Sequence, residues 1–348
     1  VPDKQRPALF ERMNITHLLW ALILGSLFLR VVSVFFAPIN QDEGWYLLAS
    51  RNFSEGLIPY QDFSFTQGPV FLWVYGKTFS MWHSVTGGRV FTAILGLSIL
   101  LPAGWIGSRL TAPSNRTACW CMVTTLVGWN LFQAEYSSIV KTYALAGVLF
   151  SSAAAALLKA TFVEGKSAIW WALAAGLLAG ASAGVRISLG AAIPMVLIYL
   201  LLNRRQFTSS IWFLFSAGAA LMLLFVFGWA WSYGGTAWMD NQIGYHVSRE
   251  GFELFGKLVG IGGHLSRLLG NYASAAVLAV CLILLRSAGS ATRRERNHRS
   301  GLLVAMLAGP FLVHLGAPFP YDDYQSPLYP VFCSWLAGAA FNTLHQIK

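Results

Sequence analysis

Two acidic side chains, Asp42 and Glu43, open a polar stretch that follows the first long apolar run of the chain. An ionised carboxylate at the edge of an apolar region can take a proton from a hydroxyl group, which is general-base catalysis. The same two residues also suit the first turn of a helix, where backbone N–H groups and the helix dipole stabilise negative charge. The residues alone leave both interpretations of Asp42 open.

Basic side chains interrupt or border several apolar runs. Arg30 lies inside the first run, Arg186 separates two runs, and Lys141 precedes another. A charge in lipid costs at least ~2.5 kcal/mol unless the side chain faces protein, is paired or reaches water. Each residue suits a phosphate ligand, and each also suits an ion-pair or snorkelling role. Several cations around one acidic loop favour phosphate binding.

Further polar residues lie between positions 232 and 270. His246 and Arg249 are three residues apart, as are His264 and Arg267, so each pair can share a helix face. No HExxH or similar ligand spacing occurs, so the sequence predicts no metal site and leaves any divalent cation undetermined. P-loop and GxGxxG motifs are absent too, which argues against nucleotide-driven chemistry.

The composition indicates a membrane protein. Of the 348 residues, 56% are hydrophobic and 11% are charged, whereas a soluble domain carries about 25% charge. The mean hydropathy is +0.56. Because the apolar runs are continuous rather than alternating, a membrane β-barrel is excluded. We expect one all-α, polytopic membrane domain over residues 1–348.

Ten apolar runs are predicted to span the membrane. They are 18–36, 88–108, 117–134, 142–158, 168–185, 187–202, 209–231, 271–285, 301–317 and 328–343. The pair around Arg186 is nearly continuous and is predicted to hinge there. The apolar segment 69–83 is too short for a span, so we expect an interfacial helix.

The positions of the charges predict the topology. The net charge is +10, and most basic residues fall in the loops that are cytoplasmic if both termini are cytoplasmic. The basic segment 286–300 then faces anionic lipid, and nucleic-acid binding is not expected. The long segments 37–87 and 232–270 become external loops.

A short external segment, 317–327, is also rich in polar and aromatic residues. Tyr321 and Tyr324 suit a belt at the membrane interface, and Asp322 and Asp323 fit plain solvated charge.

The first external loop resembles that of the GT-C glycosyltransferases. The branch with the protein mannosyltransferases and the lipid A aminoarabinose transferase is the most similar, and the segment 324–330 resembles its aromatic-proline segment. The specific motif spans roughly 40 residues, and the order of elements agrees over most of the chain. The residues that match are Arg30, Asp42, Glu43, Tyr46, Ala49, Gly56, Pro59, Tyr60, Asp62, Gly68 and Pro69.

The resemblance implies a GT-C-like fold with about ten transmembrane helices and interfacial helices in the first periplasmic loop, in the bacterial inner membrane. It implies an enzyme that moves a sugar from a polyprenyl-phosphate donor to a hydroxyl of a glycan, lipid or protein acceptor at the periplasmic face, with inversion. Asp42 is then the general base, and Glu43 supports it.

The same resemblance implies which residues bind the donor phosphate and the substrates. The cations expected at the departing phosphate are Arg186, Arg249, Arg267 and Lys141. The substrate contacts expected are Tyr46, Tyr60, Asp62, His246 and Tyr324. For Asp62 a turn, in which the carboxylate accepts from nearby backbone N–H groups, is the favoured local interpretation.

One departure from that branch keeps other functions open. Where the aminoarabinose branch has an acidic and a basic residue before its proline motif, this chain has Gln67 and Gly68. An inactive scaffold for envelope-polysaccharide assembly is therefore an alternative. A transporter or flippase of lipid-linked sugars is another, and it predicts buried charges along a path and pseudo-symmetric halves.

Overall fold

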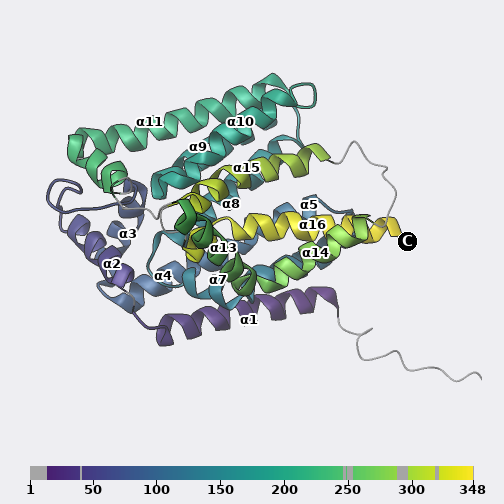
Figure 1. Ribbon diagram of the computed structural model, residues 1–348, viewed down its shortest axis with the longest axis horizontal. Coiled ribbons are helices and arrows are strands. Elements are labelled where there is room, and N and C mark those ends of the chain that lie inside the picture. Colours follow the sequence, from purple (N-terminus) through teal and green to yellow (C-terminus); the bar gives the residue numbers. More distant parts are fainter. Residues whose placement is uncertain are drawn as a thin grey trace, which may run out of the picture.

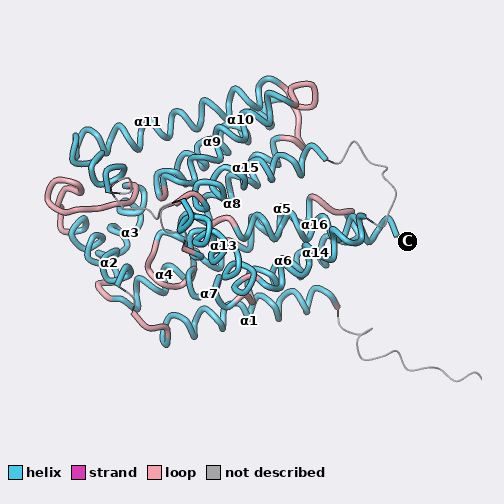
Figure 2. The backbone as a smooth tube through the Cα atoms, in the orientation of Figure 1, coloured by secondary structure: helices cyan, strands magenta, loops and turns pink. Residues whose placement is uncertain are grey.

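The protein is a bundle of helices (Figure 1). The structure is a computed structural model that describes residues 14–39, 41–245, 248, 254–287, 297–317 and 321–347. Among these residues there is no β-strand, and Figure 2 shows helices joined by loops and turns. The all-α class predicted from the sequence is confirmed.

Long helices run side by side along the bundle, and shorter helices complete it (Figure 1). The long ones are α1 (Ile15–Phe36), α4 (Val85–Ser98) with α5 (Leu100–Arg109), α8 (Thr142–Ala160), α9 (Gly165–Val185), α11 (Ser209–Met239), α15 (Asn297–Leu315) and α16 (Tyr329–Ile347). The shorter ones are α2 (Gln41–Ser54), α3 (Pro69–Trp82), α6 (Arg116–Val123), α7 (Leu131–Tyr136), α10 (Ala192–Leu202), α13 (Leu254–Asn271) and α14 (Ala273–Ser287).

Six described helices are long and apolar enough to cross a membrane, or up to seven if a bent helix pair counts as one span. They are Ile15–Phe36, Val85–Arg109, Thr142–Ala160, Gly165–Val185, Ser209–Gly244 and His298–Leu315. Each coincides with one of the ten predicted spans, so the chain is a multi-pass membrane protein. The count of ten is not confirmed.

The other four predicted spans are not among these six helices, and the reason is local in each case. The run 117–134 is divided by a π-helical turn, η3 (Thr124–Gly128), and by Asn130, whose side chain accepts from the backbone N–H of Gln133 at 2.8 Å. The run 271–285 is one arm of a helix pair bent by 94°. The run 187–202 is a shorter apolar helix, and the 19-residue helix α16 is not among the helices that are long and apolar enough to cross a membrane.

The bundle has two ends, and we name one of them by the helices that lie there. Helices α2 and α3 lie at one end, at the left in Figure 1, which we call the α2 end. The opposite end holds basic residues at helix termini, including Arg109 and Lys159. There Arg299 donates to the carbonyl oxygen of Thr161 at 3.1 Å. Residues 288–296 of the predicted basic segment lie outside the described residues.

Helix α2 begins at Gln41, where the acidic residues of its first turn predict a helix start, but its buried face only partly matches the hydropathy pattern. The spacing of Trp45, Leu48 and Ala49, three and four residues apart, predicts that these three residues share the buried face. Of the three, Ala49 is buried and Leu48 is exposed, and the other buried residues are Glu43, Tyr46, Leu47 and Ser50. The hydropathy pattern is misleading here because a charged residue, Glu43, points into the protein.

Helix α9 ends where the hinge is predicted. Arg186 follows its last turn in an extended conformation, with φ −137° and ψ 112°. A 3₁₀ turn, η4 (Ile187–Ala191), and then α10 follow. The change of direction leaves the Arg186 side chain at the α2 end of α9.

Gly68 allows α3 to begin directly against the end of α9. Its backbone N–H donates to the carbonyl oxygen of Val185 at 3.3 Å. A Cβ atom at Gly68 would overlap the carbonyl group of Gly184, which is backbone and cannot rotate away. The close approach therefore requires glycine, and it positions the segment before α3 beside the residue that precedes Arg186.

We predict that Gly68→Ala destabilises the protein, by about 1–3 kcal/mol, because the two backbones must separate. The measurement is the thermal unfolding midpoint in detergent. Gly228→Ala in α11 is the matched control, since a Cβ there meets no atom of the described residues within 4 Å. An unchanged midpoint for Gly68→Ala would contradict the close packing of α3 on α9.

Candidate active site

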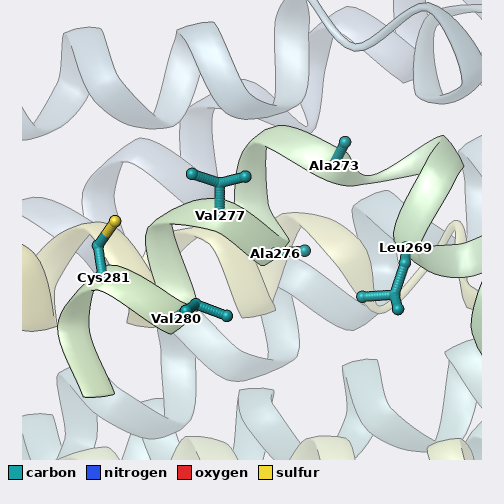
Figure 3. Close-up of a pocket in the computed structure, with 6 residues that line it drawn as sticks. All are labelled: Leu269, Ala273, Ala276, Val277, Val280 and Cys281. Carbon is teal, nitrogen blue, oxygen red and sulfur yellow. The ribbon is translucent and has the colours of Figure 1, made fainter. Parts of the chain in front are cut away.

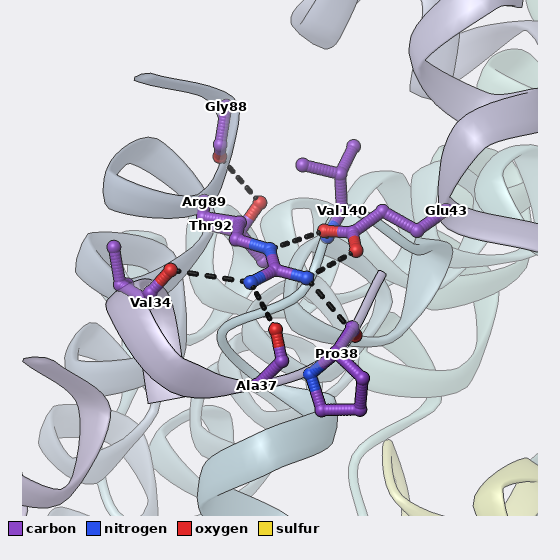
Figure 4. Close-up of polar contacts among 8 residues, drawn as sticks. All are labelled: Val34, Ala37, Pro38, Glu43, Gly88, Arg89, Thr92 and Val140. Carbon is purple, nitrogen blue, oxygen red and sulfur yellow. Dashed lines mark hydrogen bonds and ion pairs between the residues drawn. The ribbon is translucent and has the colours of Figure 1, made fainter. Parts of the chain in front are cut away.

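A buried ion pair between Glu43 of α2 and Arg89 of α4 organises the α2 end (Figure 4). The Nε of Arg89 donates to Oε1 of Glu43 at 2.8 Å, and Nη2 donates to Oε2 at 2.6 Å. The exposed fractions of the two side chains are 4% and 0%. A bidentate pair of this kind is directional as well as strong.

The pair also binds two other segments. Arg89 donates to the carbonyl oxygens of Val34, Ala37 and Pro38, at and just after the end of α1. A cation at that position satisfies carbonyl groups that have no partner within the helix. On the other side, Oε1 of Glu43 accepts from the backbone N–H of Val140 at 3.0 Å. Figure 4 shows these contacts converging on one guanidinium and one carboxylate.

This arrangement brings Asp42 and Lys141 together, because they adjoin Glu43 and Val140 in sequence. The Nζ of Lys141 lies 2.9 Å from Oδ2 of Asp42 and 3.5 Å from Oδ2 of Asp323. The Lys141 side chain is 6% exposed, whereas that of Asp42 is 67% exposed. The candidate base therefore stands at the surface and is held from inside by a buried ammonium.

Arg186 lies next to this group of charges. Its guanidinium stacks against the rings of Tyr143 and Tyr324, with 4.7 Å and 4.9 Å to the ring centroids. Its Nη1 donates to Oγ1 of Thr142 at 2.9 Å. Tyr143 in turn donates to Oδ2 of Asp323 at 2.8 Å, which links Arg186 to the Asp42–Lys141 pair.

Arg186 has no carboxylate in direct contact within the described part of the chain. Arg186 is 8% exposed, and no carboxylate among the described residues lies within 4.0 Å of it. Its Nε, like that of Arg30, is buried and has no hydrogen-bond partner among those residues. A buried guanidinium of this kind is suited to an anion.

Arg30, the other buried arginine without a carboxylate partner, is differently surrounded. It donates to the hydroxyl and carbonyl oxygens of Ser26 and to the carbonyl oxygens of Gly96 and Gly128. As predicted for an intramembrane charge, it faces protein. Its contacts join α1 to α4 and η3, so its role is structural.

Asp322 forms a separate cluster with α13. Its carboxylate oxygens accept from Nε of Arg267 at 2.9 Å and from Nδ2 of Asn271 at 3.0 Å, and Nδ1 of His264 lies 3.3 Å away. His264 and Arg267 thus share a helix face, as their spacing predicts. These contacts fix the 3₁₀ turn η6 (Asp322–Gln325) and with it Asp323.

Three predicted substrate contacts are Tyr46 of α2 and, in the segment after α2, Tyr60 and Asp62. Tyr46 is buried, and burial raises the pKa of its hydroxyl against the opposing effect of the Arg186 charge. Burial also raises the pKa of Tyr60, whose hydroxyl donates to the carbonyl oxygen of Gln67 at 2.9 Å. The Asp62 carboxylate accepts from the N–H of Ile58 at 2.7 Å, so the predicted turn is confirmed.

Two predicted residues, His246 and Arg249, lie outside the described residues. Of the other predicted cations, Lys141 is paired with Asp42 and Asp323, and Arg267 is paired with Asp322. Tyr324 lies beside Arg186.

Sequence reasoning missed three residues of the site: Arg89, Tyr143 and Asp323. Arg89 lies at the start of the predicted span 88–108, where a basic residue is easily assigned to snorkelling. Asp323 resembles ordinary loop charge next to Asp322. Its proximity to Lys141, which lies 182 positions earlier, gives no local signal.

The residues do not fit a divalent metal ion. Among the described residues, no group of three or more His, Cys, Asp or Glu side chains is placed to hold one. Where two carboxylates converge, at Asp42 and Asp323, the Lys141 ammonium lies between them.

An apolar hollow of ≈ 340 Å³ lies at the bend between α13 and α14 (Figure 3). Leu269, Val277 and Val280 line it together with alanines and Cys281, which is exposed, unlike the buried Cys119, Cys121 and Cys333. The hollow has no polar group suited to a sugar or a phosphate, so it is not the candidate site.

Comparison with known proteins identifies the fold. No protein-family model matches the sequence, and no curated protein matches it either. Among solved structures, ArnT from Cupriavidus metallidurans in the apo state has a TM-score of 0.65 at 16% identity, over 94% of this chain and 60% of that one. The same protein bound to undecaprenyl phosphate has a TM-score of 0.64 at 15% identity, with the same coverage.

A second solved protein is similar in fold to this chain. The apo oligosaccharyltransferase from Archaeoglobus fulgidus has a TM-score of 0.60 at 12% identity, over 97% of this chain and 52% of that one. ArnT, a lipid A aminoarabinose transferase, and the oligosaccharyltransferase are both GT-C glycosyltransferases. The chain therefore has the GT-C fold. It spans 52–60% of the length of these neighbours.

We predict that breaking the Glu43–Arg89 pair from one side, with Glu43→Gln or Arg89→Met, destabilises the protein by about 3–5 kcal/mol, because a buried charge loses its partner. The measurement is the thermal unfolding midpoint in detergent. Glu55→Gln is the control, since the Arg51–Glu55 pair is exposed and its loss should change little. Equal effects of Glu43→Gln and Glu55→Gln would refute the structural role.

Proposed function

We propose that the protein is a membrane glycosyltransferase that moves a sugar from a polyprenyl-phosphate donor to an acceptor hydroxyl. The reaction takes place at the α2 end, which we place on the periplasmic side of a bacterial inner membrane. The GT-C fold supports the class of enzyme, and ArnT, one of the structural neighbours, binds undecaprenyl phosphate. The acceptor hydroxyl belongs to a glycan, a lipid or a protein.

The observation that carries the proposal is that Arg186 is buried without a carboxylate in direct contact. A sugar that leaves a phosphate carrier leaves negative charge on the phosphate oxygen, and a preorganised guanidinium in a site of low polarity stabilises that charge. Arg186 is stacked on two tyrosine rings, and no carboxylate of the described residues lies within 4.0 Å of it. Arg267 and Lys141, by contrast, already have acidic partners.

Asp42 is proposed as the general base. Its side chain is exposed to an incoming acceptor, and Lys141 holds one carboxylate oxygen. In the proposed step the acceptor oxygen bonds to the anomeric carbon while the bond from that carbon to the phosphate oxygen breaks. The acceptor proton passes to Asp42, and the electron pair stays on the phosphate beside Arg186. Attack opposite the leaving group gives inversion.

Glu43 is a positioning residue in this scheme. It is fully buried, and its oxygens are bound by Arg89 and by the N–H of Val140, so it does not meet substrate. Tyr324 and Tyr46 are proposed to line the donor position, because both lie close to Arg186.

We expect Asp42→Asn to lower turnover about 10²–10⁴-fold, the usual contribution of a general base, with no change in the unfolding midpoint. The assay uses purified protein and a panel of polyprenyl-phosphate sugars, and it measures release of polyprenyl phosphate, including slow hydrolysis without acceptor. Glu55→Gln, directly after the same helix and in an exposed pair with Arg51, should retain full turnover. An active Asp42→Asn protein would remove Asp42 from the mechanism.

We expect Arg186→Met to lower turnover about 10²–10³-fold, as does the loss of other groups that stabilise developing negative charge. Arg186→Lys should recover part of it, since the charge remains while the planar fork is lost. Inhibition by added polyprenyl phosphate should weaken in parallel. Arg51→Met, which removes an exposed arginine of α2, is the control. If native protein turns over none of the donors, the scaffold and transporter alternatives gain support.

A further inference from the structure

A lysine ammonium fills the space between two carboxylates at the α2 end. The Nζ of Lys141 contacts Oδ2 of Asp42 and Oδ2 of Asp323, at 2.9 Å and 3.5 Å. Two carboxylates that converge on one point are typical ligands of Mg²⁺ or Mn²⁺, which commonly bind through one or two carboxylates together with substrate phosphate. In this chain, a side chain supplies the positive charge at that point.

We propose that Lys141 is a built-in cation that occupies the position where Asp42 and Asp323 would otherwise bind a divalent metal ion. The native protein then takes no metal at this pair, and removal of the ammonium creates a metal site. For catalysis, which rests on the proposed function, the consequence is transfer that needs no divalent metal. The position of the Lys141 ammonium between the two carboxylates does not depend on the proposed function.

The surroundings of Lys141 hold the ammonium in place. Its side chain is 6% exposed, and its Nζ lies 5.4 Å and 5.7 Å from the ring centroids of Tyr136 and Tyr143, within cation–π range. The backbone next to it is fixed by the bond from Val140 to Glu43. A metal ion that approached the pair would meet a buried like charge at close range, which is strongly repulsive.

The two carboxylates could serve a metal ion once the ammonium is gone. Asp42 is 67% exposed, so an ion can reach the pair from solvent. Oδ1 of Asp323 is buried and has no hydrogen-bond partner among the described residues, so it can act as a further ligand atom. Without Lys141, the pair keeps two negative charges and no cation of the described residues within 4.0 Å.

The test is Mn²⁺ binding to the purified full chain, followed by electron paramagnetic resonance of free Mn²⁺. We expect Lys141→Met to bind one Mn²⁺ per chain at least about tenfold more tightly than the native protein. The double variant Lys141→Met/Asp323→Asn should lose this gain. Lys159→Met, at the opposite end of α8, is the matched control and should resemble the native protein.

Two outcomes would overturn the proposal. The first is a native protein that binds Mn²⁺ and loses it on Asp42→Asn or Asp323→Asn, a measurement that needs no change at Lys141. The second is a Lys141→Met protein, or Lys141→Gln if the former does not fold, that keeps the native unfolding midpoint without gaining Mn²⁺ binding.

A turnover measurement separates this proposal from the proposed function. Where a donor is turned over, EDTA should leave the rate of the native protein unchanged, and a rate abolished by EDTA and restored by Mn²⁺ would also overturn the proposal. If no donor is turned over, the proposed function fails, while Mn²⁺ binding still decides the role of Lys141.

Discussion

The arrangement of the α2 end depends on one ion pair, between Glu43 and Arg89. Both groups are removed from water, which is costly, and the cost is offset by the bidentate contact and by four further hydrogen bonds to backbone groups. Because those bonds come from the end of α1 and from the segment before α8, the pair fixes α1, α2, α4 and α8 relative to one another. Asp42 and Lys141 meet as a consequence.

The charged residues near the Glu43–Arg89 pair have different kinds of partner. Of the two acidic residues of η6, Asp322 binds Arg267 of α13, whereas Asp323 contacts Lys141. Of two buried arginines without carboxylate partners, Arg30 is surrounded by oxygen atoms of the helices, while Arg186 has one side-chain hydrogen bond and two aromatic faces. The surroundings of Arg186 therefore leave guanidinium N–H groups available for an anion. We propose a phosphate at Arg186 because of this contrast rather than because of the fold.

The fold and the chemistry are supported by different observations. Similarity to ArnT and to the oligosaccharyltransferase extends over nearly the whole chain at 12–16% identity, which establishes the fold. Most of the predicted site residues do gather at one end of the bundle, but the first-loop motif serves mainly as structure: Glu43, Tyr60 and Asp62 are engaged by the chain itself. The candidate chemistry then falls on Asp42 and Arg186.

The sequence by itself determined the all-α membrane class, six of the long spans, the start of α2 and the hinge at Arg186. These follow from hydropathy, capping and helix-ending signals, which act over a few residues. Only the tertiary structure decided which face of α2 is buried and that Lys141 contacts two carboxylates. Those features depend on partners 46 to 182 positions away in the chain, and contacts at such distances leave no periodic signal in the sequence around either partner.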